Sequence, residues 1–148
     1  MPDAARIRPA RLSDAPELAG LTGELGYPAD TVELERRLAA LLGDPDHLVL
    51  VAARADDRAI AWLHAALRRQ LSSDAQVEVE GLVVGEAARS AGVGACLLAR
   101  AEAWALERGV PQVRLHSNVI RQRAHGFYRR AGYELVKTSC VFRKRLSP

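Results

Sequence analysis

A glycine-containing turn in the second half of the chain has the residue types to bind an anion. It reads Arg89-Ser90-Ala91-Gly92-Val93-Gly94 and precedes a predicted helix that runs to about Arg108. Glycines at a helix start let backbone N–H groups approach an anion, and the helix dipole adds partial positive charge. Arg89 adds a cation that can pair with phosphate oxygens. The turn suits a pyrophosphate, although glycine-rich turns before helices are often only turns.

Two familiar phosphate-binding motifs do not fit this turn. No Gly-Lys-Ser/Thr follows it, so it is not a P-loop. The third glycine of the dinucleotide-binding fingerprint is missing, and the turn lies in mid-chain after a predicted hairpin. The turn by itself therefore leaves its ligand open.

Two glutamates precede the turn in a strand-like segment from Gln76 to Val84. Glu78 and Glu80 are two residues apart, so a strand would point both to the same face. Either could take a proton as a general base, or both could be solvated or paired strand residues. Gly81 interrupts the alternation and indicates a bulge or a close backbone approach.

Composition narrows the class of protein. The chain has 148 residues, enough for one domain, and its 49% hydrophobic residues argue against disorder. A net charge of +3 with 5% aromatic residues suits anionic small ligands and disfavours nucleic acid as a partner. We expect no signal peptide, no membrane span and no metal site, because the first residues carry charges and prolines, no apolar run is long enough to span a membrane and no histidine or cysteine has a metal-ligand spacing. Cys96 and Cys140 read as reduced core thiols, so we expect a cytoplasmic protein.

The order of the predicted helices and strands that must position these groups indicates an α+β or mixed α/β fold. Capping signals predict two helices after the first strand, and alternation predicts a hairpin before the glutamate strand. The expected strands are 7–10, His47–Ala53, Ala59–Leu67, Gln76–Val84, Val113–Ser117 and two more within Tyr133–Leu146, with helices from Ser13, from Asp30, after Gly94 and over Arg121–Arg130.

Three motifs in this order resemble the GCN5-related N-acetyltransferase (GNAT) superfamily. Arg89-x-x-Gly92-x-Gly94 is similar to its acetyl-CoA signature, and Glu78 to Val84 is similar to its fourth strand. The segment from Arg121 to Tyr133, with Phe127-Tyr128 and a Gly-aromatic end, is similar to its C-terminal signature. The resemblance implies one domain over residues 1–148. It also implies a mostly antiparallel twisted sheet of about seven strands with about four helices, splayed between strands four and five.

The resemblance also implies a site for acetyl-CoA. Strand-four backbone would bind the pantetheine arm, the turn would hold the pyrophosphate, and Asn118 or Arg121 would contact pantetheine or phosphate. Tyr128 would lie near the coenzyme sulfur. The residues implied in cofactor binding are Leu82, Val83, Val84, Arg89, Ser90, Ala91, Gly92, Val93, Gly94, Ala95, Asn118, Arg121 and Tyr128.

The implied reaction is direct acetyl transfer to an amine in a ternary complex. Tyr128 would protonate the leaving thiolate, and a backbone N–H near Leu82 or Val83 would stabilise the oxyanion. Glu78 lies where the histone-modifying branch has its catalytic glutamate, but we favour Glu80 slightly as the base because it is closer to the expected cleft. His64 could line the acceptor site, but it reads first as a structural histidine.

The sequence does not identify the amine that accepts the acetyl group. The resemblance favours a primary amine of a small molecule: an amino-acid-like compound, an aminoglycoside or a polyamine. Alternatives are a protein N-terminus or lysine, and a non-catalytic acyl-CoA-binding regulatory module. A homodimer is compatible with the family. Ser13 to Gly43 and Thr138 to Val141 are expected to select the acceptor.

Overall fold

The computed structural model describes residues 5–89 and 91–148. The chain divides into two compact units, residues 1–116 and residues 117–148, which are described separately. The first unit holds the whole sheet and three of the helices, and the second holds one helix and a C-terminal segment. None of the described helices is long and apolar enough to cross a membrane.

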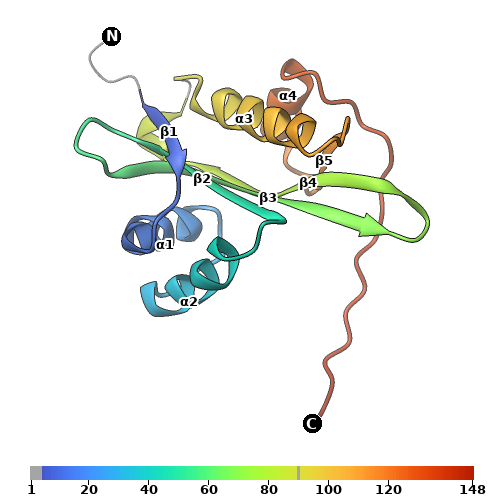
Figure 1. Cartoon of the computed structure of the whole chain (residues 1–148), viewed down its shortest axis with the longest axis horizontal. Helices are drawn as coiled ribbons and strands as arrows, with labels where there is room; N and C mark the ends of the chain where they lie inside the picture. The colour runs from blue at the N-terminus through green and yellow to red at the C-terminus, as the bar shows by residue number, and fades with distance from the viewer. Residues whose placement is uncertain (1–4, 90) are drawn as a thin grey trace. The chain divides into compact units, whose positions relative to one another are not determined.

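The first unit is built on a five-stranded sheet in the order β1-β2-β3-β4-β5 (Figure 1). The first four strands pair antiparallel, and β5 joins β4 in parallel. The fold is therefore mixed α+β, as the sequence predicts, but the expectation of about seven strands is wrong. The strands are β1 (Arg6–Pro9), β2 (His47–Ala53), β3 (Ala59–Gln70), β4 (Ser73–Val84) and β5 (Val113–Leu115).

Helices cover both faces of this sheet. Helices α1 (Ala15–Glu24) and α2 (Thr31–Leu42) lie on one face, and α3 (Val93–Glu107) lies on the other (Figure 1). The predicted cap of α2 is confirmed, because Asp30 Oδ1 accepts a hydrogen bond from the Glu33 backbone N–H at 2.7 Å. Short 3-10 turns, η1 (Leu12–Asp14) and η2 (Glu86–Ala88), precede α1 and follow β4.

Alternation along the strands sorts the apolar side chains between the two faces. On the α1/α2 face, Val49, Val51 and Val83 pack with helix residues such as Leu18 and Leu38. Trp62 is partly buried against the same cluster. This face carries the polar groups described below, so the packing of α1 and α2 fixes the surroundings of those groups.

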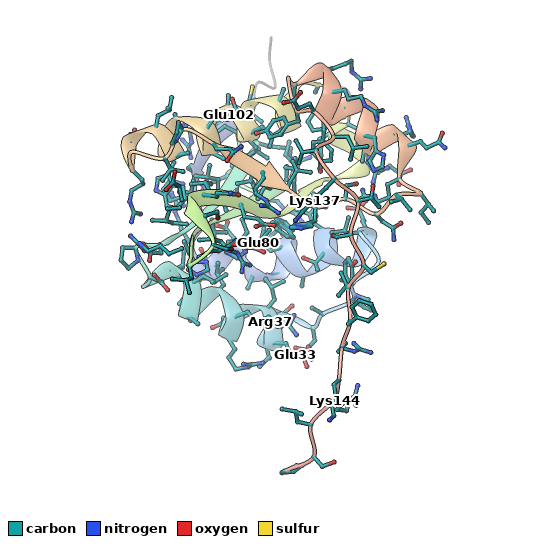
Figure 2. All side chains as sticks on the ribbon, turned by 90° about the vertical axis from the view of Figure 1, so that its right-hand side faces the viewer. Glu33, Arg37, Glu80, Glu102, Lys137 and Lys144 are labelled. Carbon is teal, nitrogen blue, oxygen red and sulfur yellow. The ribbon has the colours of Figure 1, made fainter. Side chains whose placement is uncertain are left out.

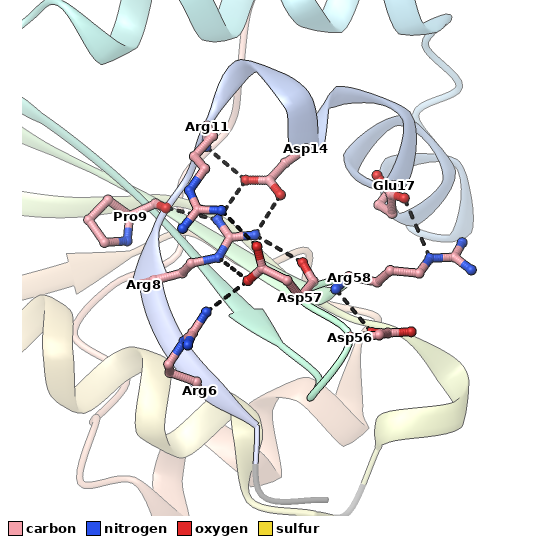
Figure 3. Close-up of polar contacts among 9 residues, drawn as sticks. All are labelled: Arg6, Arg8, Pro9, Arg11, Asp14, Glu17, Asp56, Asp57 and Arg58. Atoms are coloured by element: carbon pink, nitrogen blue, oxygen red, sulfur yellow. Dashed lines mark hydrogen bonds and ion pairs between the residues drawn. The ribbon is translucent and has the colours of Figure 1, made fainter.

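Ion pairs of the buried Arg8 link β1 to Asp14 and to the β2–β3 turn (Figure 3). The Arg8 guanidinium donates to both carboxylate oxygens of Asp14, at 2.8 and 2.9 Å, and its Nε donates to Asp57 Oδ1 at 3.0 Å. Arg6 and Arg11 also donate to Asp57. Burial alone would raise the pKa of Asp14, but the hydrogen bonds from Arg8 and from the Arg11 backbone outweigh burial and lower it.

Strand β4 changes register at its centre. His64 is opposite Gly81 and Ala65 is opposite Val79, so Glu80 is the extra residue of a β-bulge. This confirms the irregularity that Gly81 indicates in the sequence. Beyond the bulge, β4 continues to Val84 beside β3, whereas β5 pairs only with Val77 to Val79.

The second unit contains α4 (Gln122–Arg130) and a C-terminal segment. The two strands predicted between Tyr133 and Leu146 are wrong, because these residues form no helix or strand. Their apolar side chains, such as Val136, Val141 and Phe142, are 77 to 93% exposed. An alternating pattern becomes a strand only where a neighbouring strand satisfies its backbone groups, and this segment has none among the described residues.

Candidate active site

The predicted anion-binding turn has the geometry that its sequence indicates. Gly92 precedes α3 in the left-handed conformation, with φ 78°, which side-chain-bearing residues rarely adopt. The Cys96 N–H donates to the Gly92 carbonyl at 3.1 Å, so the N–H groups of Val93, Gly94 and Ala95 precede the first intrahelical bond. These three donors have no partner among the described residues, and three such donors at a helix N-terminus fit a pyrophosphate. Ala91 lies in this turn, whereas Ser90 lies outside the described residues.

Arg89 adds positive charge at the same turn. Its side chain is anchored to the end of β4, because Nε donates to the Val84 carbonyl at 3.3 Å. The residue is exposed, so the rest of the guanidinium faces solvent. A cation held beside a helix N-terminus strengthens a site for phosphate oxygens.

The open side of β4 leads directly to this turn. Among the described residues, no strand pairs with the β5 side of β4 from Glu80 to Val84. Backbone groups of a strand alternate between its two edges, so part of the Leu82–Val84 backbone faces this open side. An extended ligand with amide groups, such as a pantetheine arm, could bind there as an added strand.

The two glutamates of β4 lie on the α1/α2 face and share one arginine. Arg68 Nε donates to Glu80 Oε1 at 2.8 Å and lies 3.9 Å from Glu78 Oε2. Glu78 is 8% exposed, and its other oxygen contacts His116 Nδ1. The predicted common face of the two glutamates is therefore observed, and both carboxylates are paired.

One carboxylate oxygen of this group stays available. Both Arg68 contacts of Glu80 use Oε1, and within the described parts of the chain Glu80 Oε2 has no hydrogen-bond partner. Glu80 lies along β4 on the side of the sheet where α2, marked by Glu33 and Arg37, is found (Figure 2). An oxygen in this position can bind an ammonium group.

A pair of histidines lies beside the bulge on the same face. His64 Nε2 and His47 Nδ1 are 2.9 Å apart, and their rings stack at 5.1 Å between centroids. Burial, then His47 and Arg68, lower the pKa of His64, while Glu80 acts in the opposite direction. The sequence pattern alone did not pair them. The predicted hairpin contained the signal, since it places His47 and His64 diagonally across neighbouring strands.

A cleft of about 510 Å³ lies at the end of β4. Its walls come from α1, the start of β3 and the turn after β4, and they include Leu21, Ile60 and Gly85. Glu24 and Glu86 line it as well, and Glu24 Oε1 accepts a hydrogen bond from the Glu86 N–H at 3.3 Å. The cleft is apolar with an acidic lining, which suits a cation attached to a carbon skeleton.

The second unit carries the remaining predicted residues. The Asn118 Oδ1 accepts from the Ile120 N–H at 3.1 Å, and His125 Nε2 lies 2.9 Å from the Asn118 carbonyl. Arg121 is exposed and immediately precedes α4. Tyr128, on α4, contacts the rings of Phe127 and Tyr133. Burial raises the pKa of Tyr128, so its hydroxyl keeps its proton at neutral pH.

The two cysteines differ from expectation. Both are free, as expected, but both are exposed rather than part of the core. Cys96 lies in the first turn of α3, on the side away from the sheet, where the sequence pattern alone did not distinguish a core position from a surface one. Within the described residues, no group of three metal-ligating side chains lies close enough to hold a metal ion.

Comparison with known proteins gives the site a context. Residues 15–133 match the sequence profile of the acetyltransferase (GNAT) family. The aminoglycoside N(6')-acetyltransferase type 1 of Stenotrophomonas maltophilia is 29% identical to this chain over 149 aligned positions, covering 98% of this chain and 96% of that protein.

Solved structures share the fold at lower identity. Aminoglycoside N-acetyltransferase AAC(6')-Iy in complex with CoA has a TM-score of 0.86 at 20% identity, covering 97% of each chain. A transcriptional regulator from Bacillus halodurans C-125 has a TM-score of 0.85 at 21% identity, covering 95% of this chain and 99% of that one. At this identity the likeness concerns the fold alone.

Proposed function

Because the chain belongs to the GNAT family of acetyltransferases and is an acetyl-CoA-dependent N-acetyltransferase, we propose that it acetylates a primary amine of an aminoglycoside. The observation that carries this proposal is the end-to-end similarity to an aminoglycoside N(6')-acetyltransferase, at 29% identity over 98% of the chain. The acidic groups of the α1/α2 face support it, because aminoglycosides are polycations at neutral pH.

The cofactor would be held by the turn and the open side of β4. In this proposal the N–H groups of Val93, Gly94 and Ala95, with Arg89, bind the pyrophosphate. The backbone of Leu82, Val83 and Val84 binds the pantetheine arm. Asn118 and Arg121 keep their proposed contacts with pantetheine or phosphate. Among the described residues the Asn118 amide nitrogen has no partner, because only its oxygen is used in the local turn.

The acceptor would be held by negative charge. Glu80 Oε2 binds an ammonium group, and buried Glu78 adds to the negative field of the face. Glu24 and Glu86 at the cleft offer further carboxylates to a molecule with several amines. Arg68 offsets one of these charges and fixes the Glu80 side chain, so the free oxygen is preorganised rather than mobile.

The chain supplies two groups to the reaction, and acetyl-CoA supplies the acetyl group. Bound acetyl-CoA would provide an activated acetyl thioester. A β4 backbone N–H near Leu82 or Val83 stabilises the oxyanion, since such donors need no reorganisation during the reaction. Tyr128 donates its proton to the leaving thiolate. Its raised pKa is consistent with this role, because the hydroxyl is protonated at the working pH.

Three broader features belong to the same proposal. The chain would act as one domain, because the family match extends from α1 into the second unit. A homodimer would cover exposed apolar side chains of the C-terminal segment such as Phe142, which is 93% exposed. A cytoplasmic location suits two free exposed thiols, Cys96 and Cys140.

The test is a thermal-shift titration with acetyl-CoA followed by thiol release on an amine panel of neamine, spermidine and a lysine peptide. Acetyl-CoA at 100 times its Kd should add about 2.7 kcal/mol of stability. Thiol release with neamine and not with the other amines is the expected result. Release only with the peptide would favour a protein acetyltransferase. A thermal shift without release from any amine would favour a regulatory module, and no shift would contradict the cofactor site.

A further inference from the structure

The histidine pair beside the β4 bulge forms a path along which a proton can move to solvent. Glu78 and Glu80 form no such path. His64 Nε2 lies 2.9 Å from His47 Nδ1, and His47 Nε2 lies 3.7 Å from Asp44 Oδ2. Asp44 is in the exposed loop after α2. Three titratable groups therefore run in sequence from β3, across β2, to solvent.

Asp44 determines which nitrogens carry the protons. A neutral imidazole has one N–H and one lone pair. The Asp44 carboxylate favours the His47 proton on Nε2, so His47 Nδ1 is left as an acceptor. His64 Nε2 must then be the donor in the 2.9 Å contact, and the lone pair of His64 is left on Nδ1. Among the described residues, His64 Nδ1 has no hydrogen-bond partner.

The position of His64 is suited to the acceptor amine. His64 is directly opposite Gly81, next to the bulge residue Glu80, where the open side of β4 begins. Neighbouring strands are about 4.8 Å apart, so the imidazole lies one strand from that edge. It shares the α1/α2 face with Glu80, whose free oxygen would hold the ammonium group.

The other groups on this face are weaker candidates for the base. Glu78 is paired with His116 and Arg68, and Glu80 with Arg68. An imidazole is intrinsically a stronger base than a carboxylate, so it accepts a proton from an ammonium more readily. The groups that act on His64 are His47 from β2, Arg68 from β3 and Glu80 from β4. Burial lowers the pKa of His64, so it is neutral at pH 7.

We propose that His64 is the general base of the acetyl transfer and that His47 conducts the proton to solvent. His64 Nδ1 takes a proton from the acceptor ammonium, which leaves a neutral amine and a charged His64. The Nε2 proton of His64 then moves to His47 Nδ1, and the Nε2 proton of His47 leaves to water beside Asp44. One proton enters and one leaves, and exchange with water restores the starting tautomers. This proposal rests on the proposed function.

The first test needs no acceptor. Long-range ¹H–¹⁵N correlation spectra of the full chain at pH 7 report which nitrogen of each histidine carries the proton. We expect both His47 and His64 to be protonated on Nε2. A His64 protonated on Nδ1 would overturn the proposal, because that nitrogen would have no lone pair for the amine's proton.

The second test uses neamine and compares five chains: wild type, His64→Gln, His64→Ala, His47→Gln and Glu80→Gln. In His64→Gln the introduced amide can still donate to His47 Nδ1 but cannot act as a base, so a purely structural role would leave kcat near wild type. We expect kcat of His64→Gln to fall by about 10² or more, with a smaller fall for His47→Gln. Added imidazole should restore activity to His64→Ala.

The pH profile separates the two proposals. In wild type, kcat/KM should fall as pH decreases through a pKa below 6.5, which gives the pH profile an acid limb. The profile of His64→Gln should lack this acid limb. If Glu80→Gln loses the limb and His64→Gln keeps it, the base is a carboxylate and the histidine proposal fails. If wild type releases no thiol with neamine, the proposed acceptor fails, while the tautomer spectra still decide the histidine proposal.

Discussion

The indole ring of Trp62 lies directly over the backbone of Gly81. A Cβ built on Gly81 would be 2.6 Å from Cη2 of Trp62, closer than carbon atoms can approach. The two residues come from neighbouring strands, β3 and β4, at the bulge that also carries Glu80. Glycine is therefore required here for space rather than for backbone freedom, and the ring fixes the shape of β4 on the α1/α2 face.

Replacing Gly81 by alanine should destabilise the protein by about 1–3 kcal/mol, because the Trp62 ring must move out of a packed position. Urea unfolding measures this change. Gly20→Ala in α1 is the matched control: nothing lies within 4 Å of its Cβ, and alanine in a helix should add about 0.5–1 kcal/mol. Equal stability of Gly81→Ala and wild type would show that Trp62 is free to move.

Breaking the Arg8–Asp14 pair should be costly. Both side chains are less than 10% exposed, so Arg8→Met leaves a buried carboxylate without its cation and should cost about 3–5 kcal/mol. Arg37→Met, in the exposed pair with Glu33, should change the stability by less than about 0.5 kcal/mol. If the two variants unfold at the same denaturant concentration, the buried pair contributes no more than a surface one.

The same pair predicts an acid dependence. The pKa of Asp14 is lowered from 3.8 in the folded chain, so its stabilising effect is fully present above pH 3.8. That effect should be lost as pH falls through the folded-state pKa. Asp14→Asn should unfold with a weaker dependence on pH in this range, measured by circular dichroism, and an unchanged slope would contradict the assignment.

Reversing the charge of Arg89 should weaken acetyl-CoA binding without unfolding the chain. Arg89 is exposed and anchored at the end of β4, so Arg89→Glu would place an anion at the proposed pyrophosphate site. Loss of a charged hydrogen bond corresponds to about a tenfold to hundredfold rise in Kd, measurable by calorimetry. Arg36→Glu on α2 changes the net charge equally and should leave Kd unchanged. Equal effects of both variants would mean that only net charge matters.

Removing the Tyr128 hydroxyl should slow turnover and spare binding. We expect Tyr128→Phe to lower kcat by about 10² or more, with the Kd of acetyl-CoA nearly unchanged. Because burial raises the pKa of Tyr128 from 10.0, the fall of the wild-type rate on the alkaline side should begin only above pH 10, when the donor proton is lost. If Tyr128→Phe turns over as fast as wild type, the hydroxyl takes no part in the reaction and Tyr128 only packs against its neighbours.

Much of the first unit could be predicted because its signals are local. The turn before α3 is specified by the glycine at position 92, the start of α2 by Asp30 and Glu33, and the β2–β3 hairpin by two apolar runs around a polar turn. The common face of Glu78 and Glu80 follows from strand periodicity alone. These features depend on a few neighbouring residues, so the sequence contains the information directly.

The sequence by itself determined the glycine turn before α3, the strand ahead of it and the membership of an acetyltransferase family. Only the tertiary structure decided that the C-terminal apolar segment forms no strand, that Arg68 occupies one oxygen of Glu80, and that His64 meets His47. Each of these depends on which segments become neighbours in space. A strand needs a partner and an ion pair needs proximity, and both are set by register and packing between distant parts of the chain.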